Sequence, residues 1–220
     1  MARLPVSTRT LAHERPWLLV ALTGAVAWYF LSDNEIGGLY LILLKGVGAA
    51  ALGVYCWRRL SGTDGVLIGT VMALSALGDM AIELDFRAGG AAFFAAHVTA
   101  IALYLRHPRQ ALSNSQRMAG AALLLLTPAV SYFLMLDWAV TLYGLALGGM
   151  AAAAWWSAFP RYRVGLGAVL FVISDLLIFA RMGPLGWEEI GDLLIWPVYF
   201  AGQFLIATGV VQTMRARGSA

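Results

Sequence analysis

The sequence predicts an all-α integral membrane protein, a bundle of eight transmembrane helices that forms a single domain over residues 1–220. Three observations support this prediction. Hydrophobic residues make up 60% of the chain and charged residues only 12%, which is about half the charged share of a soluble domain. The mean hydropathy is +0.76. The apolar residues also fall into separate runs of the length that a bilayer requires.

Short polar connections separate eight apolar runs, and such tight connections suit antiparallel neighbours in a helical bundle. Spanning takes about 20 apolar residues, with about 17 as the usual lower limit, so the ends of the first and fourth runs are the least defined. No run keeps the period-two alternation of a membrane β-strand, which makes a β-barrel a poor fit. The runs are residues 17–32, 39–57, 65–84, 90–105, 117–136, 138–159, 164–182 and 192–213.

The charges at the ends of these runs alternate in sign at every crossing. Basic residues favour the cytoplasmic side of a membrane, so both termini are predicted to be cytoplasmic. A wrong helix count would break the alternation. The acidic ends contain only the bases Arg87 and Arg181, and the basic ends only the acids Glu14 and Asp64. The basic ends carry Arg3, Arg9, Arg15, Arg58, Arg59, Arg106, Arg109, Arg117, Arg161, Arg163, Arg215 and Arg217, and the acidic ends Asp33, Glu35, Glu83, Asp85, Asp137, Glu188, Glu189 and Asp192.

The pI near 9.2 therefore reflects topology and not a nucleic-acid surface, on which bases cluster in one patch. We expect no nucleic-acid partner and a location in the inner (plasma) membrane of a bacterium, with the oligomeric state left open. The one cysteine, Cys56, excludes an intrachain disulfide. An alternative for the first run is a cleaved signal peptide ending near the "AVA" at 25–27, which would leave seven helices.

Four titratable side chains fall inside the runs, namely Lys45, Asp79, His97 and Asp175. A charge at mid-membrane costs about 2.5–3.5 kcal/mol or more, so such groups usually face the bundle interior and pair with one another. Asp79 lies about 8 Å below the acidic end of its helix and Asp175 roughly 10 Å below, at 1.5 Å per residue. Lys45 and His97 fall at a similar depth.

A fifth helix brings further polar groups to the same layer. Trp196, Tyr199 and Gln203 recur at helical spacing in the last run, with Tyr199 at about the depth of the aspartates. Less specific explanations apply to each residue. Lys45 and one aspartate would form a structural ion pair, Tyr199 and Gln203 would join helices, and Trp196 would be an aromatic wall or an interfacial belt residue.

Glu83, one turn beyond Asp79 on the same face, is predicted to be solvated. Arg87 and Arg181 are predicted to be interfacial, where either would meet a lipid phosphate. One lysine cannot neutralise two aspartates, so a purely structural explanation fits the aspartates poorly.

Motif searches exclude several classes of enzyme. The chain has no G-x-S-x-G, no H-E-x-x-H and no Walker loop. The three histidines are His13, His97 and His107, and the first and last lie at the cytoplasmic ends, so a multi-histidine zinc site cannot be assembled. We therefore expect neither a metal nor a cofactor.

Four short stretches stand out in the apolar runs, namely Gly78-Asp79, "FFAAH" at 93–97, Ser174-Asp175 within "FVISDLLIF", and "YFAGQ" at 199–203. They resemble the YhhN-like lysoplasmalogenase family, a family of multi-pass membrane proteins. Their order, spacing and eight-helix frame cover most of the chain. Two positions depart from the family pattern, since Lys45 is followed by Gly46 instead of proline, and His97 is followed three and four residues later by Ala100 and Ile101 instead of an aromatic residue.

The resemblance implies cleavage of the vinyl ether bond of lysoplasmalogens, which are lysophospholipids, to a fatty aldehyde and a glycerophospho-alcohol. That chemistry suits the residues. A vinyl ether is hydrolysed by protonation of its β-carbon, so the site needs one protonated carboxylic acid and one carboxylate, as in glycoside hydrolysis. Burial favours the protonated form. We expect Asp175 as the acid, Asp79 as the carboxylate held ionised by Lys45, and His97, Tyr199 and Gln203 in supporting or substrate-binding positions.

Two other functions use the same buried charges. A small proton-coupled transporter would use the acids as proton sites, and a non-catalytic membrane scaffold would use them as a structural ion pair. A cavity open to lipid with both aspartates at its base favours the enzyme. A path that opens to both sides favours the carrier, and a dry, closed core favours the scaffold.

The charge alternation generates a prediction about topology. A reporter that is active only in the cytoplasm, fused after Ala220, should be active, because the residues after the last apolar run include the bases Arg215 and Arg217. A reporter that is active only outside the cytoplasm, fused at the same position, is the matched control and should be silent. Activity of that second reporter alone would contradict the predicted orientation.

Overall fold

A computed structural model of the chain describes residues 7–32 and 38–218, and it is helical throughout these ranges, without a strand. Of the predicted charged ends, Arg3, Asp33 and Glu35 lie outside the described residues, as do the side chains of Arg9, Glu14, Arg15, Glu188, Glu189 and Asp192. The helices are α1 (Ser7–Leu31), α2 (Leu39–Arg59), α3 (Gly62–Ala81), α4 (Phe86–Leu105), α5 (Asn114–Met135), α6 (Trp138–Trp156), the π-helix η1 (Arg161–Gly165), α7 (Leu166–Met182) and α8 (Glu188–Gly218).

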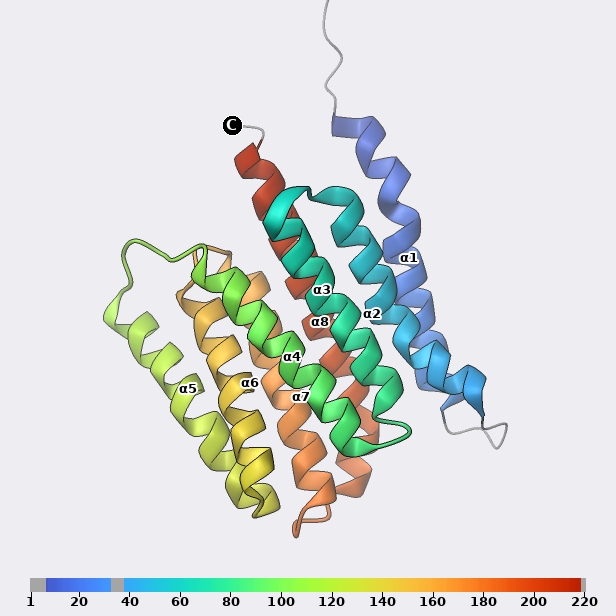
Figure 1. Cartoon of the computed structure of the whole chain (residues 1–220), viewed down its shortest axis with the longest axis vertical. Coiled ribbons are helices and arrows are strands. Elements are labelled where there is room, and N and C mark those ends of the chain that lie inside the picture. The colour runs from blue at the N-terminus through green and yellow to red at the C-terminus, as the bar shows by residue number, and fades with distance from the viewer. Residues whose placement is uncertain (1–6, 33–37, 219–220) are drawn as a thin grey trace, which may run out of the picture.

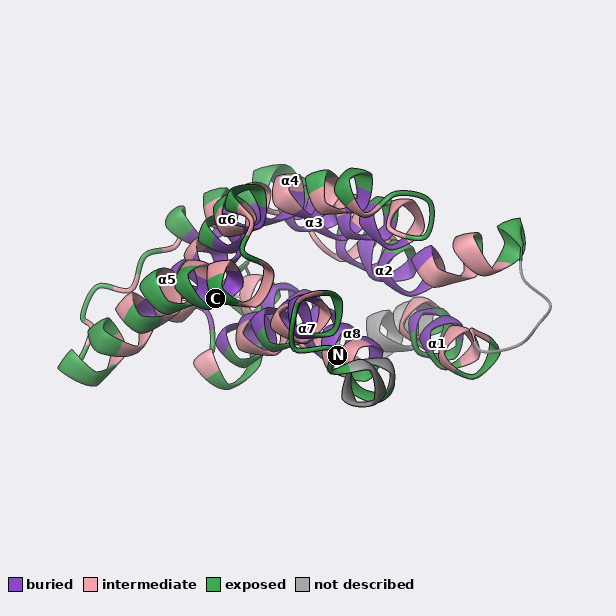
Figure 2. Ribbon diagram, turned by 90° about the horizontal axis from the view of Figure 1, so that it is seen from below, coloured by how far each residue is buried: buried purple, intermediate pink, exposed green. Residues whose placement is uncertain are grey.

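The helices pack in the cyclic order α1, α2, α3, α4, α6, α5, α7, α8, and α2 also packs on α8, and α6 on α7, across the bundle. Consecutive helices run in opposite directions, so the start of α1 and the end of α8 lie at the same end of the bundle (Figure 1). Seen along the helices, α2, α3, α4 and α6 form one row, and α7, α8 and α1 form a second row facing it (Figure 2). Buried residues occupy the faces between the two rows.

Among the described residues, seven helices are long and apolar enough to cross a membrane, so the chain is an integral membrane protein. One of them combines the π-helix and α7 as Arg161–Met182. The described part of α1 contains a shorter apolar helix, Pro16–Leu31, and an eighth crossing therefore stays a prediction. The structure also gathers the basic connections at one end and the acidic connections at the other (Figure 1). We call them the basic end and the acidic end.

Several helices begin before the apolar run that they contain. The fourth run begins at residue 90, but α4 begins at Phe86, where the Asp85 carboxylate accepts a hydrogen bond from the Ala88 N–H at 2.7 Å. The fifth run begins at 117, but Ser113 and Gln116 form a capping box that starts α5 at Asn114. The third run covers 65–84, and α3 covers 62–81 without a side-chain cap. Helix bounds do not fix where the chain enters the membrane, so the spans stay predictions.

Glycines allow close contacts between neighbouring helices. Gly144 and Gly148 in "GLALG" lie against α5, where an added Cβ would come within 2.5 Å of Ser131 Oγ and 2.6 Å of the Leu123 carbonyl oxygen. In α7 and α8, Gly167 and Gly202 face each other, and a Cβ on either would lie 2.7 Å from the carbonyl oxygen of the other. Backbone contacts of this kind are typical of helix packing in membranes.

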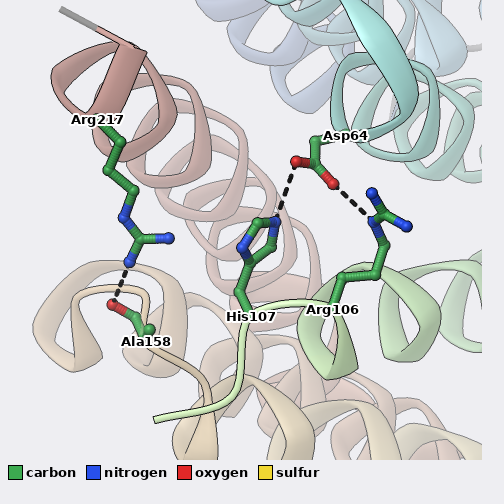
Figure 3. A network of polar contacts seen from close by, with 5 residues as sticks. All are labelled: Asp64, Arg106, His107, Ala158 and Arg217. Atoms are coloured by element: carbon green, nitrogen blue, oxygen red, sulfur yellow. Dashed lines mark hydrogen bonds and ion pairs between the residues drawn. The ribbon is translucent and has the colours of Figure 1, made fainter. Parts of the chain in front are cut away.

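Polar contacts hold the basic end together. The Asp64 carboxylate at the start of α3 accepts a hydrogen bond from Arg106 Nε at 2.9 Å and lies 3.1 Å from His107 Nε2 (Figure 3). Arg217 near the end of α8 donates to the Ala158 carbonyl at 3.1 Å. These contacts join α3, α4, α8 and the α6–α7 connection, so the basic end is tied together.

The α7–α8 contact generates a prediction about stability. Gly202→Ala should lower the free energy of unfolding by about 1–3 kcal/mol, because its Cβ meets a backbone oxygen that cannot rotate away. The matched control is Gly90→Ala in α4, whose Cβ would meet nothing within 4 Å and which should stabilise the helix slightly. Thermal unfolding midpoints in detergent test the difference, and equal midpoints for the two variants would contradict the contact.

Candidate active site

A large cavity lies between the two rows of helices at the acidic end. Its volume is about 1430 Å³, and its lining includes residues from all eight helices. This is more than the roughly 300–1,000 Å³ of a typical small-molecule pocket. Much of the wall is aromatic or aliphatic. The ionisable side chains on the wall are Tyr29, Lys45, Asp79, Glu83, Arg87, Asp137, Tyr143, Asp175, Arg181 and Tyr199.

One carboxyl group of the cavity wall belongs to Asp79 on α3. Its Oδ2 accepts a hydrogen bond of 2.9 Å from the Tyr199 hydroxyl on α8. Tyr199 in turn accepts a hydrogen bond of 3.2 Å from Gln203 Nε2, one turn further along the same helix. All three side chains are buried. The tyrosine thus connects the carboxyl group on the cavity wall to an amide that lies behind the wall.

The second carboxyl group belongs to Asp175 on α7 and has the same kind of support. Its Oδ2 accepts a hydrogen bond of 2.6 Å from the Tyr143 hydroxyl on α6. Because that hydroxyl donates its single proton to Asp175, its partner at 3.0 Å, His97 Nε2 on α4, is the donor in their contact. The Ser174 hydroxyl lies 3.3 Å from Oδ1 of Asp175. Each aspartate is therefore oriented by a tyrosine that has its own buried polar partner.

Two phenylalanine rings pack on each other and on the Tyr199 ring. Phe93 and Phe171 meet edge to face at 5.9 Å, and both meet the Tyr199 ring, at 5.8 and 5.2 Å. Gly78, directly before Asp79, makes room for this arrangement, because a Cβ there would lie 2.8 Å from the Phe93 ring. The Gly78-Asp79 pair thus combines a carboxyl group with the space that the adjacent ring needs.

Lys45 forms no salt bridge with either aspartate, so the structural ion pair between Lys45 and an aspartate is absent, while its action on the charge of Asp79 stays a prediction. Its ammonium group forms a salt bridge with Glu83, one turn beyond Asp79. Glu83 was predicted to be solvated, and its side chain is 38% exposed, but it is also the partner of the lysine. The pairing follows from reach, because Lys45 lies close to the acidic end of α2 and its long side chain extends toward that end.

The structure brings four of the six predicted site residues to the cavity wall, namely Lys45, Asp79, Asp175 and Tyr199. His97 and Gln203 are not in the lining and contact it through the two tyrosines. Tyr143 was missed in the sequence. The signal was its depth, five residues from the acidic end of its run, which matches the depth of the aspartates.

Comparisons with known proteins place the chain in a family. A model of the YhhN family matches residues 40–210. Two curated relatives, each named lysoplasmalogenase, come from Mycobacterium bovis and Mycobacterium tuberculosis. Each is 31% identical over 153 residues, which is 63% of this chain and 58% of the relative. The match thus spans less than two thirds of the relatives' length. No solved structure matches the chain.

The tyrosine contacts generate a prediction about the site. Tyr143→Phe should lower the free energy of unfolding by about 1–3 kcal/mol, because it leaves buried groups of Asp175 and His97 without the hydroxyl between them. Tyr162→Phe is the matched control, since Tyr162 is 82% exposed. Thermal unfolding of both variants tests this. A Tyr143→Phe midpoint as high as that of Tyr162→Phe would show that the hydroxyl stabilises nothing.

Proposed function

The chain belongs to the YhhN family, and from that premise we propose that it is an intramembrane hydrolase of lysoplasmalogens. The reaction is cleavage of the vinyl ether bond to give a fatty aldehyde and a glycerophospho-alcohol. The observation that supports it most is that the wall of one cavity carries Asp79 and Asp175, each of which accepts a hydrogen bond from a tyrosine. The names of the two mycobacterial relatives point to the same substrate.

The reaction needs acid and base at different atoms. In the first step the acid gives its proton to the β-carbon of the vinyl ether, and positive charge develops at the carbon bound to oxygen. Water adds to that carbon and gives a proton to the carboxylate. The product of this addition is a hemiacetal. In the second step the hemiacetal hydroxyl returns a proton to the first acid, and the leaving oxygen takes a proton from the second. One water is consumed, and both carboxyl groups end as they began.

We assign the acid to Asp175 and the carboxylate to Asp79. The one lysine on the cavity wall belongs to α2, which packs against α3 and α8, and it pairs with Glu83 next to the α3 aspartate. A nearby cation favours the ionised form of a carboxyl group, and Lys45 acts on Asp79 in that sense, partly offset by its salt bridge with Glu83. Asp175 has serine and tyrosine hydroxyls as its neighbours, which suits a group that must release and regain a proton.

Tyr143, Tyr199, His97 and Gln203 are positioning residues in this proposal. They hold each carboxyl group in one orientation. Less entropy is then lost when the reacting atoms come together. The apolar and aromatic remainder of the wall suits the alkyl chain of the lipid.

The carrier and scaffold alternatives fit the cavity less well. A carrier needs access from both sides, but the lining residues all come from the acidic-end half of the bundle. On the other side, Leu103, Tyr104, Phe159 and Val164 form a buried apolar core. A scaffold needs no cavity of this volume beside its polar residues. These observations favour the enzyme.

The mechanism generates a prediction about activity. Asp79→Asn and Asp175→Asn should each reduce the rate of aldehyde release by about 10²–10⁴-fold, because asparagine keeps the shape but can neither release nor accept the proton. The double variant should resemble the slower single variant, because groups that act as a unit are not additive. Aldehyde release from a lysoplasmalogen by the purified protein is the measurement.

The matched control for these variants is Asp85→Asn. Asp85 is exposed, lies outside the cavity and caps α4, a role that asparagine also fills. This variant should keep its activity. Thermal unfolding is measured on the same samples. If an aspartate were only part of a structural ion pair, its variant would lose stability but keep its turnover. Near-normal turnover in either single variant would show that the two-carboxylate mechanism is wrong.

A further inference from the structure

Two tryptophans form a cage around the Lys45 ammonium group on the cavity wall. The ammonium nitrogen lies 4.5 Å from the centre of the Trp28 ring on α1 and 5.9 Å from that of Trp196 on α8. The two rings lie 4.3 Å apart with their planes at 47°. The Glu83 carboxylate completes the surroundings of the nitrogen. Two aromatic faces and one carboxylate are the typical surroundings of a bound ammonium ion.

The cage is held in place by contacts that do not involve the lysine. Trp196 Nε1 donates a hydrogen bond of 2.9 Å to the Ala25 carbonyl, which fixes the indole against α1. Pro197 has no N–H to offer the Leu193 carbonyl one turn earlier, and the Tyr29 hydroxyl donates to that carbonyl at 3.2 Å. The two contacts join α1 to α8, so the rings do not depend on Lys45 for their positions.

The cage opens onto the cavity that contains the aspartates. Trp28, Lys45, Glu83 and Trp196 all line it together with Asp79. Glu83 follows Asp79 by four residues on the same face of the chain, which places it about 6 Å closer to the acidic end. The lysine and glutamate side chains are 14% and 38% exposed. A molecule in the cavity can therefore reach both members of the ion pair.

We propose that the cage of Trp28, Trp196 and Glu83 is a binding site for the ammonium group of a zwitterionic phosphate–ammonium head group, and that Lys45 occupies it when the cavity is empty. The ligand's ammonium takes the place of the lysine between the rings and beside Glu83. The displaced Lys45 ammonium then pairs with the phosphate of the same head group. The proposal rests on the proposed function for the lipid that carries the head group.

Charge balance makes this exchange feasible in a poorly solvated site. Before binding, Lys45 pairs with Glu83, and afterwards each of them pairs with one end of the zwitterion. No charge is left without a partner. An unpaired charge would be costly in such surroundings. An anionic head group offers a phosphate but no ammonium, so Glu83 would lose its partner whenever Lys45 moved. The cage thus selects zwitterionic over anionic head groups.

The experiment measures binding and not turnover, so that its result is independent of the proposed reaction. Purified full-length protein in detergent is titrated with 1-acyl lysophospholipids, which carry an ester in place of the vinyl ether. Their head groups are ethanolamine, choline or glycerol, and calorimetry gives the dissociation constants. We expect ethanolamine and choline to bind at least about tenfold more tightly than glycerol. Equal affinity for the three head groups would overturn the proposal.

Variants locate the selectivity in the cage. Trp28→Leu and Glu83→Gln should lose most of the preference while still binding the glycerol lipid. Trp138→Leu is the matched control, because Trp138 is 74% exposed and outside the cavity, and it should keep the preference. If Trp28→Leu does not fold, Trp28→Phe tests the same ring with a weaker cation–π contact. A preference that survives both Trp28 replacement and Glu83→Gln would contradict the site.

Two further arms separate the possible sources of the head group and the two proposals. Free phosphoethanolamine in the same titration shows whether the ligand is a soluble zwitterion or a lipid, and either result supports the cage. A protein that binds the zwitterionic lipids selectively but releases no aldehyde from a lysoplasmalogen would retain the cage and lose the proposed reaction. A protein that releases aldehyde with no head-group preference would do the reverse.

Discussion

The structure depends on the cost of placing carboxyl groups among apolar helices. A buried polar group without a partner costs far more in such surroundings than in water. Asp79 and Asp175 each receive a hydrogen bond from a tyrosine on a different helix. The two tyrosine hydroxyls need polar partners as well. Gln203 and His97 hydrogen-bond to them one layer further from the cavity. Hydrogen bonds thus join α3 to α8, α6 to α7 and α4 to α6. The ring contact between Phe171 and Tyr199 joins α7 to α8.

The same requirement explains the small residues beside the polar ones. The Phe93 ring packs edge to face on Tyr199, which reaches Asp79 from α8, and Gly78 gives that ring its space. Gln203 follows Gly202, whose missing side chain lets α8 approach α7. The motif "YFAGQ" therefore contains a site residue, its support and the close helix contact that sets their position. Chemistry and packing are specified by adjacent residues.

Much of the fold could be predicted from the sequence because hydropathy and loop charge report directly on crossings. The aspartates, Lys45 and His97 could be predicted as site residues because a charge inside an apolar run is costly and so stands out. Tyr143 carries no charge, and its depth, which matches that of the aspartates, was the one signal that marked it. The partner of Lys45 could not be predicted, because it depends on how far one side chain extends along the cavity. Trp28 and Trp196 resemble interfacial belt residues in sequence, and only the positions of their rings show a cage.

Proton transfer to carbon by a buried acid is the central claim, and the isotope content of the product tests it most directly. The wild-type protein is incubated with a lysoplasmalogen in D₂O, and the released aldehyde is analysed at once by mass spectrometry. The account predicts one deuterium per aldehyde, on the carbon next to the carbonyl group, because that carbon is protonated when the vinyl ether is cleaved. An aldehyde that contains no deuterium, or the absence of any aldehyde, would contradict it.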